Sequence, residues 1–138
     1  MADAEDLLTA LRAINGTAAF NRWAGFEVIA AKPGAVELRM AWRAELGQYA
    51  GYLHAGLIGA LIDTVCGFAG ATVTKRLLAS HFSVNCLSPA VGDAFVARGR
   101  VVKAGRKQIF AVAELFAEKD GATKLVATGD AILVPVDA

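Results

Sequence analysis

The pattern of apolar and polar positions divides the chain into a short amphipathic helix, a hairpin, a long apolar helix and a run of strands. From about Ala4 to Ala13, apolar residues recur at the spacing of one helix face, and a further turn or two extends toward Trp23. The ranges Phe26–Ala31 and Ala35–Trp42 flank the turn Lys32-Pro33-Gly34 and predict a hairpin. Apolar and charged residues alternate in its second strand, which predicts one buried face and one solvent face.

The stretch GYLHAGLIGALIDTVCGFAG, from Gly51 to Gly70, predicts a helix that is apolar on nearly every side. Such a helix must be covered on nearly every side, and its many glycines and alanines allow backbone to approach backbone. Turn signals containing glycine or proline separate the segments that follow it. Three or four further strands are predicted, over about Leu78–Leu87, Ala94–Lys103, Lys107–Glu118 and Lys124–Val134.

The order of these elements predicts an α+β fold in which a curved antiparallel sheet wraps around one long central helix. The short turns between successive strands favour antiparallel pairing. A strongly curved sheet is the simplest cover for an apolar helix. The length predicts a single domain over residues 1–138, with residues 1–23 as an N-terminal helical segment.

Charge and composition exclude several classes of function. The formal net charge is +1, which gives no general attraction to nucleic acid or to an anionic membrane surface. The region Leu53–Val73 is nearly long enough to span a bilayer, but a carboxylate at its centre would cost a few kcal/mol in lipid. The N-terminus is acidic and does not resemble a signal peptide. Cys66 and Cys86 lie in apolar runs without metal-ligand spacing, so we expect reduced core cysteines, no metal site and a cytoplasmic location.

Two features of the long helix suggest chemistry. Ala55 and Gly56 lie at its expected start, where backbone N–H groups lack intrahelical acceptors and carry the positive end of the helix dipole. Such groups suit a carbonyl oxygen that gains negative charge during attack. Asp63 is a carboxylate in apolar surroundings, which would raise its pKa toward the range of a general base. The structural alternative is an aspartate satisfied by neighbouring hydroxyls such as that of Thr64.

These residues also form a pattern that resembles a known family. The pattern consists of His54-Ala55-Gly56, then Leu61-Ile62-Asp63 nine positions after the histidine, and Leu87-Ser88-Pro89-Ala90 before Gly92-Asp93. It is similar to that of the hotdog-fold acyl-CoA thioesterases, in particular the PaaI-like branch of phenylacetate degradation. The resemblance covers roughly Phe26 to Val134. The family usually has glycine where this chain has Ala55, but alanine also supplies the backbone N–H.

The resemblance implies hydrolysis of acyl- or aryl-CoA thioesters, with the thioester as substrate and no further cofactor. It implies that the Ala55 amide polarises the carbonyl, that Asp63 acts as base or nucleophile, and that His54 forms the helix entry. Gln48, six positions before the histidine, stands where the family has a side chain that helps to bind substrate or water; a solvated loop residue is the alternative. Basic residues near the Ala104-Gly105 turn are expected to meet the CoA phosphates: Lys103, Arg106 and Lys107.

Helix geometry then constrains the assembly. Ala55 and Asp63 are eight residues apart, so they lie about 12 Å from each other along one helix and cannot both reach one carbonyl. Two subunits related by a two-fold axis can combine them. The resemblance accordingly implies a homodimer with shared sites, and a homotetramer built as a dimer of dimers. Cys66 lies about 18 Å from His54 along the same helix, which argues against a Cys–His pair.

Some alternatives stay open at this point. A non-catalytic acyl-CoA-binding hotdog protein, or a hotdog dehydratase or hydratase, would share the fold. His81, Ser83 and Asn85 alternate on one face of a strand, which is either solvated or lines the site. The preferred acyl group is not encoded in any motif.

Overall fold

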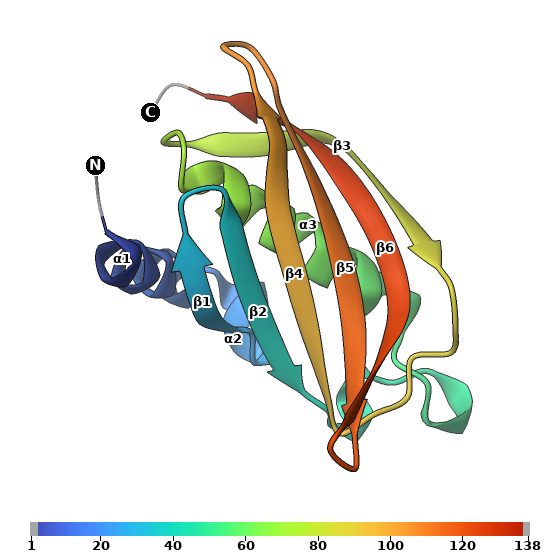
Figure 1. Cartoon of the computed structure of the whole chain (residues 1–138). Helices are drawn as coiled ribbons and strands as arrows, with labels where there is room; N and C mark the ends of the chain where they lie inside the picture. The colour runs from blue at the N-terminus through green and yellow to red at the C-terminus, as the bar shows by residue number, and fades with distance from the viewer. Residues whose placement is uncertain (1–2, 137–138) are drawn as a thin grey trace.

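The computed structural model describes residues 3–136, in which one antiparallel sheet carries all its helices on a single side (Figure 1). Residues 1–2 and 137–138, the ends of the expected 1–138 domain, lie outside this range. The six strands are ordered β1-β2-β4-β5-β6-β3. The main elements are α1 (Ala4–Thr17), α2 (Ala19–Ala24), β1 (Glu27–Lys32), β2 (Ala35–Ala41), α3 (Ala55–Ala71), β3 (Leu77–Cys86), β4 (Ala94–Ala104), β5 (Ile109–Lys119) and β6 (Ala122–Pro135).

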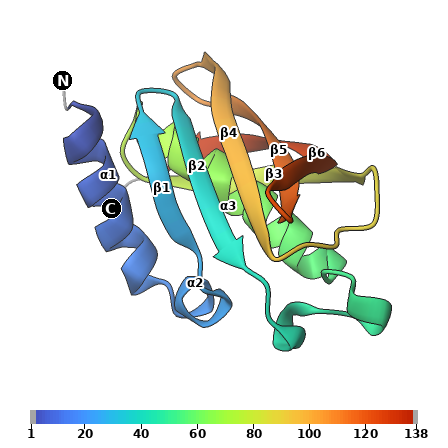
Figure 2. The same ribbon diagram turned by 60° about the horizontal axis from the view of Figure 1, so that its bottom comes forward.

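The sheet curves around α3, which confirms the architecture predicted from the sequence (Figures 1 and 2). The residues of α3 that face the strands are fully buried, among them Leu61, Ile62 and Val65. Its opposite side is only half-buried or exposed and contains Gly56, Ala60, Asp63 and Gly67. Within one chain, the sheet therefore covers one side of α3, although both sides of the helix consist mostly of apolar residues.

All six strands predicted from the sequence are present, with ends that differ by at most two residues. Two strand starts differ by two residues: β6 begins at Ala122 instead of Lys124, and β5 begins at Ile109 instead of Lys107. The amide of Gly105 donates to the carbonyl of Gln108 at 2.9 Å, so residues 105–108 form the turn. The pattern of apolar residues could not distinguish this turn from the first residues of the strand.

Two glycines of the sheet allow α3 to contact the strands through backbone. A Cβ on Gly99 of β4 would lie 2.8 Å from the carbonyl oxygen of Val65. A Cβ on Gly129 of β6 would lie 2.5 Å from both Ile62 Cγ2 and the carbonyl oxygen of Ser83. Any larger side chain would push the helix away from the sheet, so these two positions determine how deeply α3, and Asp63 with it, is seated.

The N-terminal helices extend the helix layer beside α3 (Figure 2). Helix α1 lies against β1, where Arg12 Nε donates to the Val28 carbonyl at 3.0 Å and Asn15 Nδ2 donates to the Phe26 carbonyl at 2.8 Å. Helix α2 ends at Gly25, whose φ of +80° is a left-handed conformation that glycine adopts without strain. These contacts fix the beginning of the chain at the β1 edge of the sheet.

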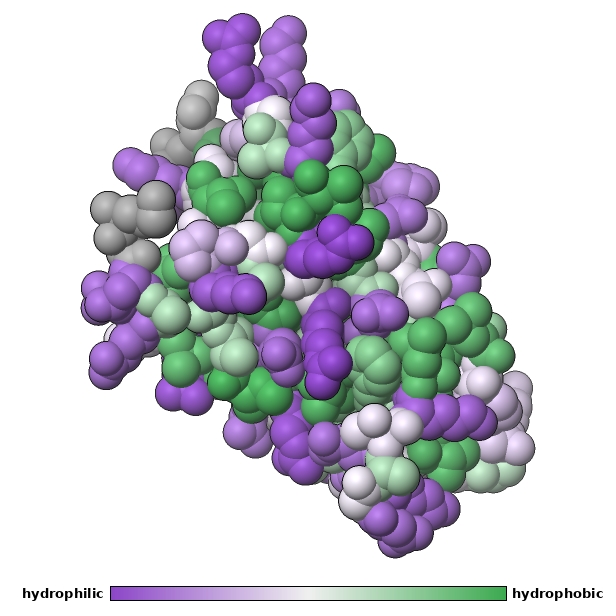
Figure 3. All heavy atoms as spheres, in the orientation of Figure 1, coloured by the Kyte–Doolittle hydropathy of each residue, from purple (hydrophilic) through white to green (hydrophobic). Residues whose placement is uncertain are grey.

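The outer face of the sheet, opposite α3, carries no helix and mixes apolar with charged side chains (Figure 3). Arg98 of β4 lies 3.6 Å from the carboxylate of Glu37 and 4.8 Å from the ring centre of Phe116. Phe110 and Val102 remain 38% and 56% exposed. An antiparallel sheet that only meets solvent usually has a polar outer face, so this composition is unusual for a free surface.

Strand β3 forms one edge of the sheet and is exposed along most of its ten residues. Large apolar side chains on and after it remain open, with exposed fractions of 65% for Leu78, 46% for Phe82 and 52% for Leu87. Unpaired backbone groups along an edge can bind another strand. A long apolar edge of this kind is suited to pairing with a second chain.

Among residues 3–136, no helix is both long and apolar enough to cross a membrane.

We expect Gly129→Ala to destabilise the protein by about 1–3 kcal/mol, because the added methyl group meets Ile62 and a backbone carbonyl that cannot move independently. Urea denaturation measures the change in the free energy of unfolding. Gly16→Ala in α1 is the control, since nothing lies within 4 Å of the Cβ that it adds. Equal stability of Gly129→Ala and wild type would show that α3 does not depend on this close approach.

Candidate active site at the start of the central helix

The first turn of α3 leaves one backbone N–H group free. His54 is the N-cap, and its Nδ1 accepts a hydrogen bond from the Gly56 amide at 2.8 Å. The amides of Leu57 and Ile58 donate to the His54 carbonyl at 2.9 and 3.2 Å. Within residues 3–136, the Ala55 amide has no acceptor. Of the two amides singled out from the sequence, Gly56 is therefore occupied and Ala55 is available.

The cap also fixes the state of the histidine. Nδ1 must be unprotonated to accept the Gly56 hydrogen bond, so the ring proton of neutral His54 lies on Nε2. The imidazole is exposed in the single chain. His54 thus caps the start of α3 with both its Nδ1 atom and its carbonyl oxygen.

The loop before α3 is closed by backbone hydrogen bonds, which hold Ala55 in place. The His54 amide donates to the Leu46 carbonyl at 3.0 Å, and the Leu53 amide donates to the Ala90 carbonyl at 2.9 Å. An isolated bridge pairs Gly47 with Leu53. Leu46 and Leu53 are fully buried and anchor both sides of this loop.

Gln48 lies in the same loop. Its Nε2 donates to the Leu53 carbonyl at 3.2 Å, and its backbone N–H donates to the Tyr52 carbonyl at 2.8 Å. The side chain is bound to the loop next to His54, and it remains exposed. Gln48, His54, Ala55 and Gly56 therefore gather at one end of α3.

Asp63 lies near the middle of α3 on its half-buried side. Desolvation by burial raises the pKa of its carboxyl group above the ordinary value of 3.8. The carboxylate accepts no hydrogen bond from any of the residues 3–136, and the neighbouring Thr64 hydroxyl does not bind it. The alternative in which local hydroxyl groups satisfy the carboxylate of Asp63 is therefore not realised in the structure.

The basic turn predicted to meet CoA lies far from this end of α3. Lys103, Arg106 and Lys107 surround the turn between β4 and β5, whereas α3 starts beside the residues that lead into β4. Eleven residues of β4 separate these two ends of the sheet, which corresponds to about 36 Å (Figure 1). Within one chain the turn and the Ala55 amide cannot act on the same small group.

Three polar residues of β3, His81, Ser83 and Asn85, face away from α3. Ser83 is paired with Asp130, and its hydroxyl donates to Oδ1 of that residue at 2.9 Å on the outer face. Phe82 points the other way, with a ring carbon 3.5 Å from where a Cβ on Gly59 would be. His81 and Asn85 share the side of Ser83. Of the two possibilities left open by the sequence, these residues form an outer surface and do not line the start of α3.

The two cysteines occupy different environments. Cys66 is fully buried on α3, and desolvation, followed by the charges of Asp63 and Asp130, raises the pKa of its thiol to about 12. Cys86 is exposed, so the expectation that both are core residues is wrong for Cys86. The cause is the position of β3 at the sheet edge, which hydrophobicity along one strand does not reveal.

A groove of about 930 Å³ crosses the outer face of the sheet. Its charged lining consists of Lys32, Glu37, Arg98 and Arg100 on one half, and of Glu114 and Asp130 on the other. None of its lining residues belongs to α3 or to the loop before it. Residues 3–136 contain no cluster of His, Cys, Asp and Glu that could hold a metal ion. We place the candidate site at α3, where the free amide and the desolvated carboxylate lie, and not in this groove.

Comparison with solved structures shows the same fold throughout this group of proteins. A thioesterase family protein from Silicibacter pomeroyi is 32% identical, with 96% of this chain and 99% of that chain covered and a TM-score of 0.92. The PaaI protein of the E. coli phenylacetic acid degradation operon is 18% identical, with 99% and 98% covered and a TM-score of 0.87. Zebrafish thioesterase superfamily member 2 is 22% identical, with 98% and 100% covered and a TM-score of 0.81.

The last two likenesses, at this level of identity, concern the fold alone. No protein with a curated function matches the chain. The family model described as the thioesterase superfamily matches residues 50–124, which is more than half of the chain and includes the start of α3 and Asp63. With the helix-in-sheet fold and the Silicibacter relative, this match shows that the chain belongs to the thioesterase superfamily.

Proposed function

We propose that this protein hydrolyses acyl-CoA or aryl-CoA thioesters, with the Ala55 amide and Asp63 as its catalytic groups. The observation that carries the proposal is that α3 has both a free backbone amide at its start and a desolvated carboxylate further along the helix. A desolvated carboxylate without a hydrogen-bond partner reduces stability, and such groups concentrate at functional sites. The Ala55 amide is exposed in the single chain, so it is open to a ligand.

In the proposed reaction the Ala55 N–H and the positive end of α3 bind the thioester carbonyl oxygen. Asp63 removes a proton from water as the water oxygen attacks the carbonyl carbon, or attacks that carbon itself. The resulting oxyanion is stabilised by the amide. The C–S bond then breaks, the CoA sulfur leaves and takes up a proton, and the acid is released; in the covalent variant, water hydrolyses the acyl-aspartate first.

We propose further that two chains form each site. Ala55 and Asp63 are about 12 Å apart along one helix, so one chain cannot bring both to a carbonyl. The long exposed edge of β3 and the half-buried stripe of small residues on α3 both support an isologous pairing of two copies. Antiparallel pairing of two β3 strands would bring the basic turn of one chain to the end of the sheet where the other chain's α3 begins.

A dimer of dimers is consistent with the outer face of the sheet. One half of its groove has a net positive charge, because Lys32, Arg98 and Arg100 outnumber Glu37, and the other half has Glu114 and Asp130, so two copies of the groove are complementary in charge. Phe110 is exposed on the same strands. Two outer faces that meet about a two-fold axis parallel to the strands would place unlike halves opposite each other. We therefore propose that a homotetramer uses this face.

Asp63→Asn should lower kcat by at least about a hundredfold, the usual effect of removing a positioned base or nucleophile. Assays with a panel of aryl- and acyl-CoA thioesters that follow free thiol measure this, with Thr64→Val as the control. Full activity of Asp63→Asn would exclude the proposed mechanism.

The same variant should be more stable than wild type at neutral pH. Burial raises the pKa of Asp63 in the folded state, so the unfavourable contribution of its charge grows as the pH rises through that pKa and persists above it. Below the ordinary value of 3.8 the carboxyl group is neutral in both states, and the difference in Tm should vanish. A Tm difference independent of pH would assign the effect to packing.

Mixed dimers test the shared site. Ala55→Pro removes only an N–H that has no acceptor; Ala55 is the first residue of α3, where proline is tolerated, and His54 already has the extended backbone required before proline, with φ −62° and ψ 135°. Asp63→Asn and Ala55→Pro should each be inactive alone. After subunit exchange about half of the dimers are mixed, each with one intact site of two, so activity should approach about a quarter of wild type.

Native mass spectrometry confirms that mixed dimers form. Confirmed mixed dimers without activity would place the whole site within one subunit.

Arg106→Ala should raise KM for CoA thioesters and leave KM for the corresponding pantetheine esters unchanged, because only CoA carries the nucleotide phosphates. Lys119→Ala, at the turn on the opposite end of the sheet, is the matched control. An equal effect of Arg106→Ala on both kinds of ester would show that the turn between β4 and β5 supports the scaffold instead of binding phosphate.

A further inference from the structure

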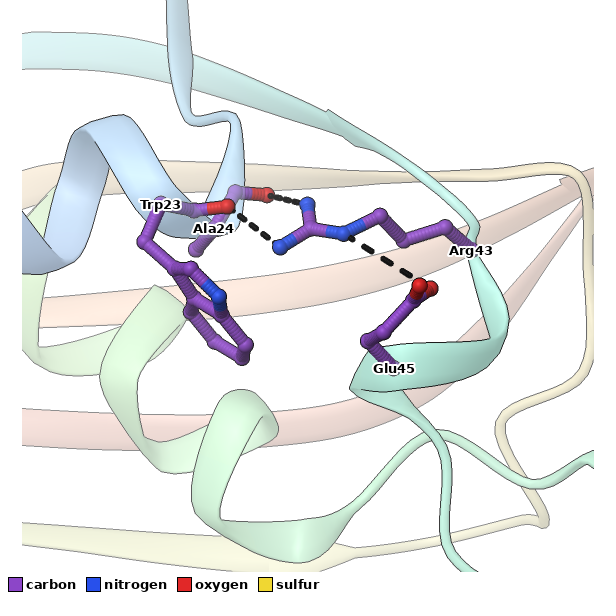
Figure 4. Close-up of polar contacts among 4 residues, drawn as sticks. All are labelled: Trp23, Ala24, Arg43 and Glu45. Atoms are coloured by element: carbon purple, nitrogen blue, oxygen red, sulfur yellow. Dashed lines mark hydrogen bonds and ion pairs between the residues drawn. The ribbon is translucent and has the colours of Figure 1, made fainter.

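Arg43 joins α2 to the loop that leads into α3 (Figure 4). Its Nη1 donates to the Ala24 carbonyl at 3.3 Å, and its Nη2 donates to the Trp23 carbonyl. The guanidinium carbon lies 4.8 Å from the ring centre of Trp23. Nε is 3.9 Å from the carboxylate of Glu45, which lies in the loop.

These contacts differ in strength. Trp23 and Ala24 end a six-residue helix, so their carbonyls lack intrahelical partners and carry the negative end of its dipole. A planar guanidinium can bind two such oxygens at once and stack on an indole ring. The Glu45 side chain is 69% exposed, so that ion pair contributes little. The attachment to α2 therefore rests mainly on the two carbonyls and the ring.

The loop transmits this attachment to the start of α3. The Arg43 carbonyl accepts from the Leu46 amide at 3.0 Å, and the Leu46 carbonyl accepts from the His54 amide at 3.0 Å. His54 directly precedes Ala55. Two backbone hydrogen bonds and one peptide bond thus connect Arg43 with the free amide of Ala55. Leu46 is fully buried and cannot absorb a shift without repacking.

We propose that Arg43 is a positioning residue, which holds the Ala55 amide at the orientation needed to bind the thioester oxygen. The inference rests on the proposed function of that amide. Arg43 does not approach α3 itself and acts only through the loop. A displacement of about 1 Å at a catalytic group can cost about a hundredfold in rate, so a modest shift of the loop is sufficient to affect turnover.

The test compares three variants with wild type: Arg43→Ala, Arg43→Lys and Arg39→Ala. Arg39 is the matched control, because it also forms a surface ion pair, with Glu118 at 3.3 Å, and has no link to the loop. Arg43→Ala should lower kcat by about tenfold or more with KM unchanged. Arg43→Lys keeps the charge but loses the bidentate geometry, so its kcat should be intermediate. Arg39→Ala should leave both parameters unchanged.

Hydrogen exchange followed by mass spectrometry gives a readout that does not require activity. Peptides covering residues 44–54 should exchange faster in Arg43→Ala than in wild type, and those in Arg39→Ala should not. Unchanged exchange in Arg43→Ala would overturn the proposal, as would a loss confined to KM or a kcat equal to that of wild type. If wild type hydrolyses no thioester, the proposed function fails, and the link between Arg43 and the loop is then decided by exchange alone.

Discussion

The direct packing of α3 on backbone atoms of the sheet is the constraint on which the rest of the molecule depends. Gly99 and Gly129 let the helix approach until backbone and side chain of α3 touch the strands themselves. Because α3 is apolar on nearly every side, the sheet has to curve around it, and its far side still remains partly open. Asp63 lies on that open side, so the depth of the helix also sets the solvation of the carboxylate.

At the start of α3, a single residue provides the hydrogen-bond acceptors for three backbone amides. His54 supplies both an imidazole acceptor and a carbonyl acceptor, and together they bind the amides of Gly56, Leu57 and Ile58. Of the amides in this first turn, only that of Ala55 has no acceptor among residues 3–136. The hydrogen bonds of His54 stabilise the start of the helix and leave one amide without a partner. Such a departure from full pairing is expected where function competes with stability.

Much of the fold could be predicted because periodicity reports directly on burial. Alternation in Ala35–Ala41 corresponds to a strand with one buried face, and the nearly continuous apolar character of Ala55–Ala71 corresponds to the central helix on which the sheet packs. The environment of Cys86 could not be predicted in this way, because strand order places β3 at an edge, and order depends on pairings distant in sequence. The orientation of His81, Ser83 and Asn85 needed the register with β6 for the same reason.

The part of the candidate site that depends on helix geometry could be predicted from the sequence. Contacts between a side chain and backbone atoms could not. The spacing of Ala55 and Asp63 follows from residue count alone. The contacts of Arg43 do not, since its partners are carbonyl oxygens of Trp23 and Ala24 that every residue possesses. A single arginine after a strand carries no pattern, and the contacts of Arg43 depend on α2 ending beside the loop (Figure 4).

The burial of Cys66 limits what kind of acyl chemistry the helix can support. A thiol with a pKa of about 12 stays protonated at physiological pH and is a poor nucleophile, although it lies one turn from Asp63. A thiolate there would accept the acyl group as another thioester and pass it on, which keeps the reactive bond for a second acceptor. With this thiol protonated, the reaction proposed at α3 depends on the carboxyl oxygens of Asp63 and on water instead of on sulfur.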